Sequence, residues 1–208
     1  KNLCTESKIT QNSGLNLFYK KRARAGGIVQ KTFFKGSCMK TQITSVNQIP
    51  SMRYLRAYAQ KLRSEGKSNA EIFMKLLLEF TGTPYVWGGA TTEGSDCSGT
   101  VCTALNALFE RERRVTADEL YRRFFTHPFL ELPHNLAQSY EQRIHALFFL
   151  DETGRAVHVA GYIGKGFYMN ESSLEPLKCG TRRTYTELRQ RYPQLLLVRR
   201  HYTEGPWE

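Results

Sequence analysis

The stretch "GTPYVWGGATTEGSDCSGTVCTALN" (residues 82–106) places a glycine-rich loop directly ahead of a helical pattern. Ser95 or Asp96 suits the N-cap position of that helix, so Cys97 falls in its first turn. Backbone N–H groups without helical partners and the positive end of the helix dipole lie in that turn. We therefore predict that the helix start lowers the pKa of the Cys97 thiol and makes the sulfur a nucleophile.

The predicted helix has one apolar face, which fixes the direction of the sulfur. This face combines Cys97 with side chains at helical spacing, namely Val101, Ala104, Leu105 and Leu108. The thiol is thus expected to point toward the body of the domain, where the N–H groups of the first turn can steady an oxyanion on a substrate carbonyl. The alternative is a small buried cysteine that serves only packing.

Composition limits the possible classes of protein. The chain has 208 residues, 40% of them hydrophobic, which is enough for a sizeable core, and it has a formal net charge of +11. This charge attracts polyanions such as nucleic acid, anionic lipid or the acidic polymers of a bacterial wall, without choosing among them. The apolar runs are too short to span a membrane.

The cysteines do not form the pattern of a metal site. They number five, an odd count, and the sequence has no CxxC pair, which argues against both a zinc site and a fully paired disulfide framework. Cys97 and Cys102 lie on different sides of the predicted helix, so they are not expected to bridge.

The charge pattern divides the chain at about residue 50. The first forty residues contain nine Lys or Arg and one acidic residue. We predict a basic, partly disordered N-terminal extension over residues 1–50, with one strand near "IVQKTFF" (28–34). Residues 51–208 are predicted to form the catalytic domain.

Periodicity within residues 51–208 indicates an α+β fold. Apolar residues at helical spacing predict four helices, over 51–66, from the Ser68–Glu71 capping box onward, from Cys97 onward and over 116–125. Thr81–Asp96 is predicted to be a loop. Strand patterns follow at 144–150, 156–163, 167–172 and 195–202. Helices that precede a set of antiparallel strands are typical of the α+β class.

A nucleophilic thiol needs a base, and the base needs a group that orients it. Of the five histidines, only His158 lies inside a convincing strand, "AVHVAGYI" (156–163). If the following turn centres on Gly164, Asn170 lies opposite His158, with side chains about 5 Å apart on one face. Considered alone, a histidine at this position is more often a satisfied core histidine than a base. With Asn170 opposite, the sequence predicts a triad of Cys97, His158 and Asn170.

The spacing of these residues resembles the signature of the NlpC-type cell-wall cysteine peptidases. The nucleophile motif is Tyr85-x-Trp87-Gly88-Gly89, then six residues, then Asp96-Cys97-Ser98-Gly99. The stretch "HVAGYIGKG" (158–166) is similar to the base-bearing strand of the family, and Asn170 falls at the position of its third polar residue. The resemblance covers about residues 68–172. It implies a compact papain-like fold, with N-terminal helices packed on an antiparallel sheet and the nucleophile at a helix N-terminus.

The resemblance also implies an activity. It points to a cysteine hydrolase of peptidoglycan stem peptides, of the D-γ-glutamyl-diamino acid endopeptidase type, with no metal or organic cofactor. Cys97 would be the nucleophile, His158 the general base and Asn170 the orienting residue. Enzymes of this family act in the cell envelope or periplasm or are secreted, so the expected partner is peptidoglycan or a peptide derived from it.

Four further residues of the motif are assigned to substrate binding or to the oxyanion site. The resemblance implies that the Tyr85 hydroxyl lies near the oxyanion, and Asp96, Ser98 and Trp87 complete this group. A core aromatic is the alternative for Tyr85.

Two other functions remain open from the sequence. The first is a relative of the same fold that acts on lipid esters or protein side-chain amides, as an effector or phage lysin. The second is a non-catalytic cationic module that binds wall polymer or nucleic acid. Release of new amino groups from purified wall identifies the peptidase, whereas the module predicts salt-sensitive binding without labelling of Cys97.

The basic extension predicts a measurable contribution to binding. A protein that begins at Ser51 is expected to bind wall less tightly at low salt than the full chain, yet to cleave a small soluble peptide at the same rate. The reason is that electrostatic attraction acts on the charged polymer and is screened beyond about 8 Å at physiological salt. Sedimentation with purified wall over a salt series measures this. Equal binding by both proteins at every salt concentration would contradict it.

Overall fold

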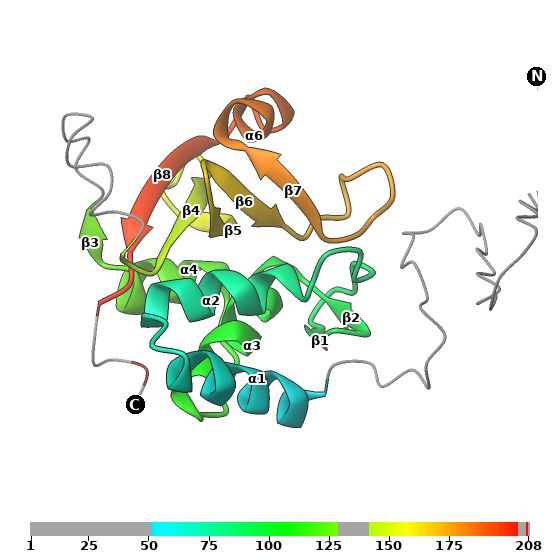
Figure 1. The fold of residues 1–208 in the computed structure, drawn as a ribbon. Helices are drawn as coiled ribbons and strands as arrows, with labels where there is room; N and C mark the ends of the chain where they lie inside the picture. The colour runs from blue at the N-terminus through cyan, green and yellow to red at the C-terminus, as the bar shows by residue number, and fades with distance from the viewer. Residues whose placement is uncertain (1–50, 129–141, 204–206, 208) are drawn as a thin grey trace, which may run out of the picture.

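The computed structural model describes residues 51–128, 142–203 and 207. Helices pack against an antiparallel sheet (Figure 1), which confirms the predicted α+β class. The predicted strand at 28–34 and the basic extension lie outside the described residues, so the domain boundary near residue 50 stays a prediction.

Three of the four predicted helices form as expected. They are α1 (Met52–Ser64), α2 (Asn69–Leu78) and α3 (Cys97–Phe109). The hydroxyl of Ser51 caps α1 by accepting the Tyr54 N–H. Ser68 and Glu71 form the predicted capping box, in which each side chain accepts the backbone N–H of the other residue.

The fourth predicted helix differs in its geometry. A single turn, α4 (Ala117–Glu119), continues into a π-helix, η1 (Leu120–Phe124). The hydroxyl of Thr116 caps α4 by accepting the Glu119 N–H. The sequence pattern therefore located this helix correctly but could not distinguish its wider turn.

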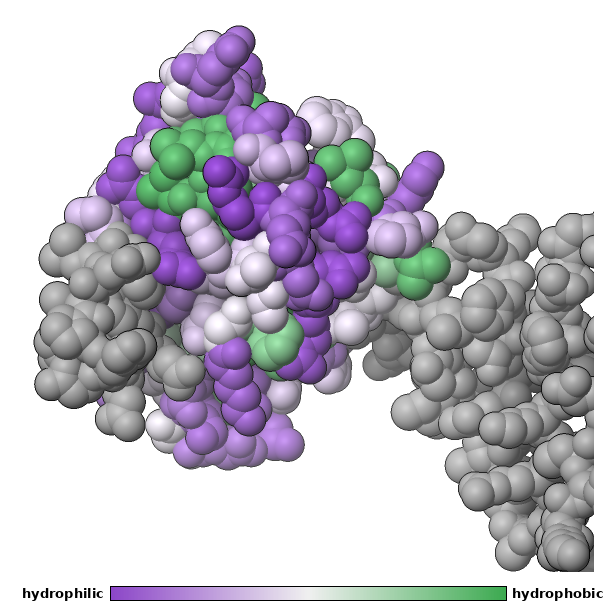
Figure 2. Space-filling view, turned by 90° about the horizontal axis from the view of Figure 1, so that it is seen from above, coloured by the Kyte–Doolittle hydropathy of each residue, from purple (hydrophilic) through white to green (hydrophobic). Residues whose placement is uncertain are grey.

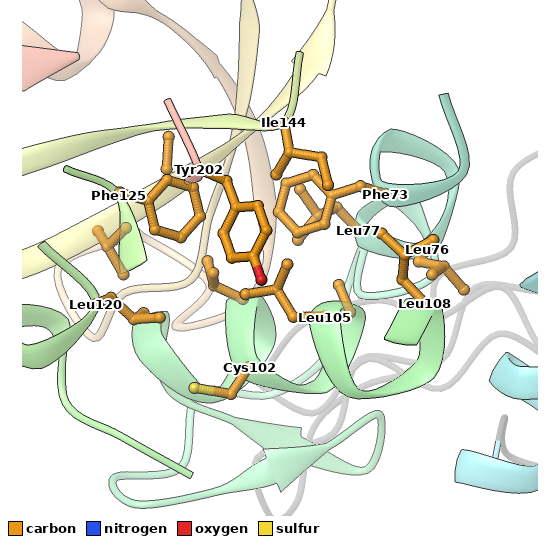
Figure 3. Close-up of a cluster of buried hydrophobic side chains, with 14 of the residues drawn as sticks. Phe73, Leu76, Leu77, Cys102, Leu105, Leu108, Leu120, Phe125, Ile144 and Tyr202 are labelled. Carbon is orange, nitrogen blue, oxygen red and sulfur yellow. The ribbon is translucent and has the colours of Figure 1, made fainter. Parts of the chain in front are cut away.

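Helix α3 is the centre of the molecule. Its residues from Ser98 to Leu108 are all buried. Helices α1 and α2 pack on one side of it and strand β5 (Ala156–Gly164) on another. Figure 3 shows Leu105 and Leu108 pointing toward the rings of Phe73 and Tyr202, between the helices and the sheet. A helix enclosed in this way holds its first residue, Cys97, in a fixed position relative to the sheet.

Within the part of the chain that the structure describes, the main sheet has six strands in the order β3-β8-β4-β5-β6-β7, all antiparallel to their neighbours. Besides β5, its strands are β3 (His127–Pro128), β4 (His145–Leu150), β6 (Phe167–Asn170), β7 (Thr181–Thr184) and β8 (Leu196–His201). Strands β4, β5, β6 and β8 confirm the four predicted strands. Sequence reasoning missed β3, β7 and the helix α6 (Tyr185–Arg191), as well as a small hairpin of β1 (Ala90–Thr91) and β2 (Gly94–Ser95) inside the predicted loop.

Both faces of the sheet are covered. On β4, Phe148 belongs to the large core under α1 to α4, whereas Leu147 and Phe149 belong to a smaller core that includes Leu188 of α6. A strand buried on both faces is apolar at every position, which explains the run "ALFFL" in β4.

The surface seen from above is mainly hydrophilic, and its hydrophobic side chains lie in separate patches (Figure 2). Among the described residues, none of the helices combines the length and the apolar character needed to cross a membrane.

Gly161 allows α2 to approach β5 closely. A Cβ atom at this position would lie 2.5 Å from Cδ1 of Leu77, far closer than side chains normally approach. Because Leu77 is itself fully buried, it has little space into which to move.

We predict that Gly161→Ala lowers the free energy of unfolding by about 1–3 kcal/mol, as overpacking of a core does. In the Leu77→Ala background the obstructing side chain is gone, so the same substitution should cost much less. Urea unfolding of the four proteins gives the coupling directly. An equal penalty in both backgrounds would show that Leu77 is not the obstacle.

Candidate active site

The start of α3 is fixed by the carboxylate of Asp96. Its Oδ1 accepts the Gly99 N–H at 2.7 Å and its Oδ2 accepts the Gly88 N–H at 2.8 Å, so one side chain joins the helix to the glycine-rich loop. The loop also accepts the Asp96 N–H at the Gly89 carbonyl, 3.1 Å away. A Cβ atom on Gly99 would lie 1.9 Å from that carbonyl oxygen. The close contact between loop and helix thus requires glycine at position 99.

Arg114 closes the other side of this carboxylate. Its Nη2 donates to both oxygens of Asp96, at 2.7 and 2.6 Å, and its Nη1 donates to the Ser98 hydroxyl at 3.0 Å. The hydroxyl of Ser98 in turn donates to Asp96 at 3.0 Å. Asp96 and Ser98 therefore hold the turn that carries Cys97, and their contact with substrate stays a prediction. The sequence marked Arg114 only as part of a charged run, "ERERR" (110–114).

Cys97 is the first residue of α3 and is partly exposed. Its sulfur accepts backbone hydrogen bonds from Ser98 and from Val159, which follows His158 on β5. The thiol therefore lies against the strand that carries the histidine. Cys102 is also a free thiol, so the two cysteines do not bridge, as their positions around the helix predicted, and Cys102 is fully buried.

The prediction that the helix start lowers the pKa of Cys97 is wrong. Burial, and after it the negative charge of Asp96, raises the pKa of this thiol to about 11. The two backbone hydrogen bonds and the charge of Arg114 act in the opposite direction but do not outweigh burial. Cys97 is therefore a neutral thiol at pH 7, and a reaction at its sulfur needs a base that takes the proton.

The ring of His158 is enclosed by two aromatic side chains. Phe149 meets it edge to face at a centroid distance of 4.8 Å, and Tyr192 stacks on it at 5.3 Å. Burial lowers the pKa of His158, while the Asn170 hydrogen bond and the charges of Asp96 and Glu175 oppose this shift. The ring is therefore uncharged at neutral pH and able to accept a proton.

The side chain of Asn170 holds this ring by one hydrogen bond. His158 Nε2 lies 2.7 Å from Asn170 Oδ1. An amide oxygen can only accept, so Nε2 carries the proton and Nδ1 is the accepting nitrogen of the neutral ring.

The predicted cross-strand register needs a correction. Strand β5 pairs with β6 through Tyr162 opposite Tyr168, so the turn centres on Lys165 rather than on Gly164. A bulge lies beside the turn, and Lys165 adopts a positive φ of 54°. If this register continues, the residue opposite Asn170 lies two positions after His158 on β5, so Asn170 and His158 are diagonal neighbours. A shift of two residues keeps both side chains on one face, so they still meet.

A second irregularity lies next to His158. Between the pairs Phe149–His158 and Leu150–Ala156, strand β5 contains one additional residue, Val157, whose side chain is exposed. Bulges of this type redirect neighbouring side chains and are frequent beside functional sites.

The amide of Asn170 has a further partner that sequence reasoning missed. Its Nδ2 donates to Glu175 Oε1 at 2.8 Å. The Glu175 side chain has no exposed surface and is bound by Arg183 at 3.1 and 2.5 Å. Arg191 lies 3.7 Å from the same carboxylate. Nothing in the stretch "NESSLEPLKCG" (170–180) distinguishes Glu175 from Glu171, four residues earlier, or marks it for this role.

Tyr85 and Trp87 lie on the loop in front of the thiol. The Tyr85 N–H donates to the Lys178 carbonyl at 2.8 Å, which joins this loop to the segment after β6. Burial, and then the charges of Cys97 and Asp96, raises the pKa of Tyr85 to about 12, so its hydroxyl stays protonated. The Trp87 side chain is 86% exposed. Both are accessible candidates for substrate contact, and that role stays a prediction.

The other described histidines lie at the opposite end of the sheet. His201 on β8 pairs with both His127 on β3 and His145 on β4. Over residues 51–128, 142–203 and 207, no three potential metal ligands gather into a site for an ion.

A cysteine at the start of a helix that packs against a histidine-bearing strand of an antiparallel sheet is typical of the papain-like class. The model of the NlpC/P60 family matches residues 82–198, which is more than half of the chain, so the protein belongs to this family. A comparison with curated proteins finds none that is similar in sequence.

Several solved structures resemble the fold. The chain is similar to NlpC1 from Trichomonas vaginalis (21% identity, TM-score 0.48), with 67% of this chain and 46% of that chain covered. An NlpC/P60 family protein from Bacillus cereus gives 19% identity and a TM-score of 0.47, with coverage of 66% and 41%. The peptidoglycan hydrolase RipB from Mycobacterium tuberculosis gives 20% identity and a TM-score of 0.45, with coverage of 76% and 73%. The chain spans less than half the length of the first two.

The pKa of about 11 predicts how Cys97 reacts with iodoacetamide. Between pH 7 and 10 its thiolate fraction should rise about tenfold per pH unit, because the pH stays below the pKa. Alkylation should therefore increase throughout this range without a plateau, as followed by peptide mass spectrometry. Cys102 has a similarly raised pKa but is buried, and should stay unlabelled until the protein unfolds. A rate that is already constant at pH 7 would instead reveal a thiolate paired with an imidazolium.

Proposed function

We propose that the protein is a cysteine hydrolase that cleaves amide bonds in peptidoglycan stem peptides. In this proposal Cys97 is the nucleophile, His158 the general base and Asn170 the residue that orients the base. The observation that carries the proposal is the 2.7 Å hydrogen bond between His158 Nε2 and Asn170 Oδ1, on the strand against which the thiol lies. This bond directs the accepting nitrogen of His158 away from Asn170 and leaves it available to the thiol.

The proposed reaction begins with a neutral thiol and a neutral imidazole. His158 Nδ1 takes the proton of Cys97 as the sulfur attacks the carbonyl carbon of the scissile amide, and a tetrahedral oxyanion forms. Collapse of this intermediate breaks the C–N bond, while the imidazolium gives its proton to the leaving amine. Water then attacks the thioester, His158 accepts a proton from it, and the carboxylic acid leaves as Cys97 regains its proton.

We assign the oxyanion contact to the hydroxyl of Tyr85. The raised pKa of this hydroxyl keeps it an O–H donor over the whole neutral range, as stabilisation of a negative oxygen requires. Trp87 offers an exposed aromatic face to the substrate. Asp96 and Ser98 contribute by holding the turn of Cys97 in place.

The choice of peptidoglycan rests on family membership together with charge. The match to the NlpC/P60 family covers the segment that holds Cys97, His158 and Asn170, and the net charge of +11 suits an acidic wall polymer. We propose the amide bond beside a D-γ-glutamyl residue as the scissile bond. The corresponding place of action is the cell envelope, the periplasm or the outside of the cell.

The proposal predicts a graded series of losses on purified peptidoglycan. Cys97→Ala should abolish hydrolysis, and His158→Ala should lower the rate about 10²–10⁴-fold, the usual contribution of a general base. Asn170→Ala should cost about tenfold, because one neutral hydrogen bond contributes about 0.5–1.5 kcal/mol. Mass spectrometry of the released fragments, together with assay of new amino groups, measures all three.

Cys102→Ala is the matched control, because it removes the other free thiol of α3 from a buried position and should leave the rate unchanged. Hydrolysis by Cys97→Ala at the wild-type rate would overturn the proposal. Labelling of Cys97 without any release of amino groups from wall would indicate a reactive thiol with another substrate, such as a lipid ester or a protein side-chain amide.

A further inference from the structure

The carboxylate of Glu175 is enclosed by polar partners beside the triad. Its side chain is fully buried, and its partners are the amide of Asn170 and the guanidinium groups of Arg183 and Arg191. Burial alone would raise the pKa of Glu175, but hydrogen bonds from Arg183 and Asn170 lower it below the ordinary value, so the group is ionised. A buried carboxylate costs free energy unless its partners compensate it, which makes its position behind the triad informative.

We propose that Glu175 is a positioning residue that fixes the direction of the Asn170 amide and thereby the tautomer of His158. The proposal rests on the function assigned above to Cys97 and His158. It adds a fourth member to the site, one that touches neither substrate nor thiol.

The hydrogen-bond donors and acceptors of Glu175, Asn170 and His158 allow only one orientation of the Asn170 amide. An ionised carboxylate only accepts, so Glu175 Oε1 requires the NH₂ group of Asn170 at 2.8 Å. With its nitrogen held there, Asn170 must present its oxygen to His158, and that oxygen requires a proton on Nε2. Nδ1 is then left without a proton, as a general base needs. The reversed amide would set its oxygen against the carboxylate and its NH₂ against Nε2, and would so protonate the wrong nitrogen.

Arg183 is the second hydrogen-bond partner of Glu175. It donates to both oxygens of Glu175. Oε1 of Glu175 accepts from both Asn170 Nδ2 and Arg183 Nε, whereas Oε2 accepts from Arg183 Nη2. A glutamine at position 175 has a single accepting oxygen: placed at the Oε1 position it leaves Asn170 unchanged but turns its NH₂ toward an Arg183 donor, and placed at the Oε2 position it turns its NH₂ toward Asn170 and favours the inactive tautomer of His158. This neutral, nearly isosteric change thus removes the requirement that Asn170 present its oxygen to His158.

The first test is Glu175→Gln in the full-length protein. We expect hydrolysis of peptidoglycan and of a small soluble peptide to fall roughly tenfold, the upper end for one hydrogen bond. The loss should be similar to that of Asn170→Ala, because the glutamine, like deletion of the amide, leaves both tautomers of His158 available.

Glu187→Gln is the matched control. Glu187 also pairs with Arg183, at 3.7 Å, but none of its described hydrogen bonds reaches Asn170, and glutamine preserves its capping box with Thr184. Both rates should stay within about twofold of wild type, a change too small to indicate a role in the reaction. Thermal unfolding identifies any variant whose loss reflects folding, and rates are compared only below the melting transition.

The second test is a rescue. Asn170→Asp alone sets a second carboxylate beside Glu175 and should be at least as damaging as Asn170→Ala, because like charges at this distance repel strongly. In Asn170→Asp with Glu175→Gln, the glutamine NH₂ donates to the aspartate, and the aspartate accepts the His158 Nε2–H. The active tautomer is again favoured, and we expect both rates to recover several-fold over Glu175→Gln alone.

The outcomes separate this inference from the proposed function. Wild-type rates for Glu175→Gln in a protein whose hydrolysis still requires Cys97 would overturn the positioning role and leave the triad intact. A Glu175→Gln loss that the double variant fails to restore would show that the carboxylate acts only through stability, and would also overturn it. Hydrolysis that survives Cys97→Ala refutes the proposed function itself.

Discussion

The hydrogen bonds of the Asp96 carboxylate are the constraint on which the rest of the site depends. They connect the glycine-rich loop, the first turn of α3 and Arg114 at one buried point. Because α3 is buried along nearly its whole length, a fixed helix start also fixes the position of Cys97 relative to β5. The geometry between thiol and imidazole is therefore determined by the core of the domain and not by a flexible loop.

Burial has opposite effects on the two reacting groups. It raises the pKa of Cys97 to about 11 and lowers the pKa of His158, so both favour their uncharged forms at neutral pH. In the proposed reaction the thiolate therefore forms as the sulfur attacks and is not present beforehand. Such a site depends on the direction of the histidine proton, which gives the hydrogen bond of Asn170 and the carboxylate of Glu175 their importance.

Much of this arrangement could be predicted from the sequence. The helix start at Cys97 and the strand of His158 follow from local patterns, since apolar periodicity and capping residues act over a few positions. The exact register of β5 and β6 could not be predicted, because it depends on a bulge and on the positive φ of Lys165. The thiol pKa was predicted wrongly because helix position is local, whereas burial depends on the whole fold.

The partners Arg114 and Glu175 were missed for a related reason. Each lies in a polar stretch where one charged residue resembles its neighbours, and only tertiary contacts turn it inward.

The ¹⁵N chemical shifts of the His158 ring, in the wild-type protein at neutral pH, test the tautomer of this histidine most directly. We predict a proton bonded to Nε2 and none on Nδ1, as the contact with Asn170 requires. A proton on Nδ1, or on both nitrogens, would contradict it.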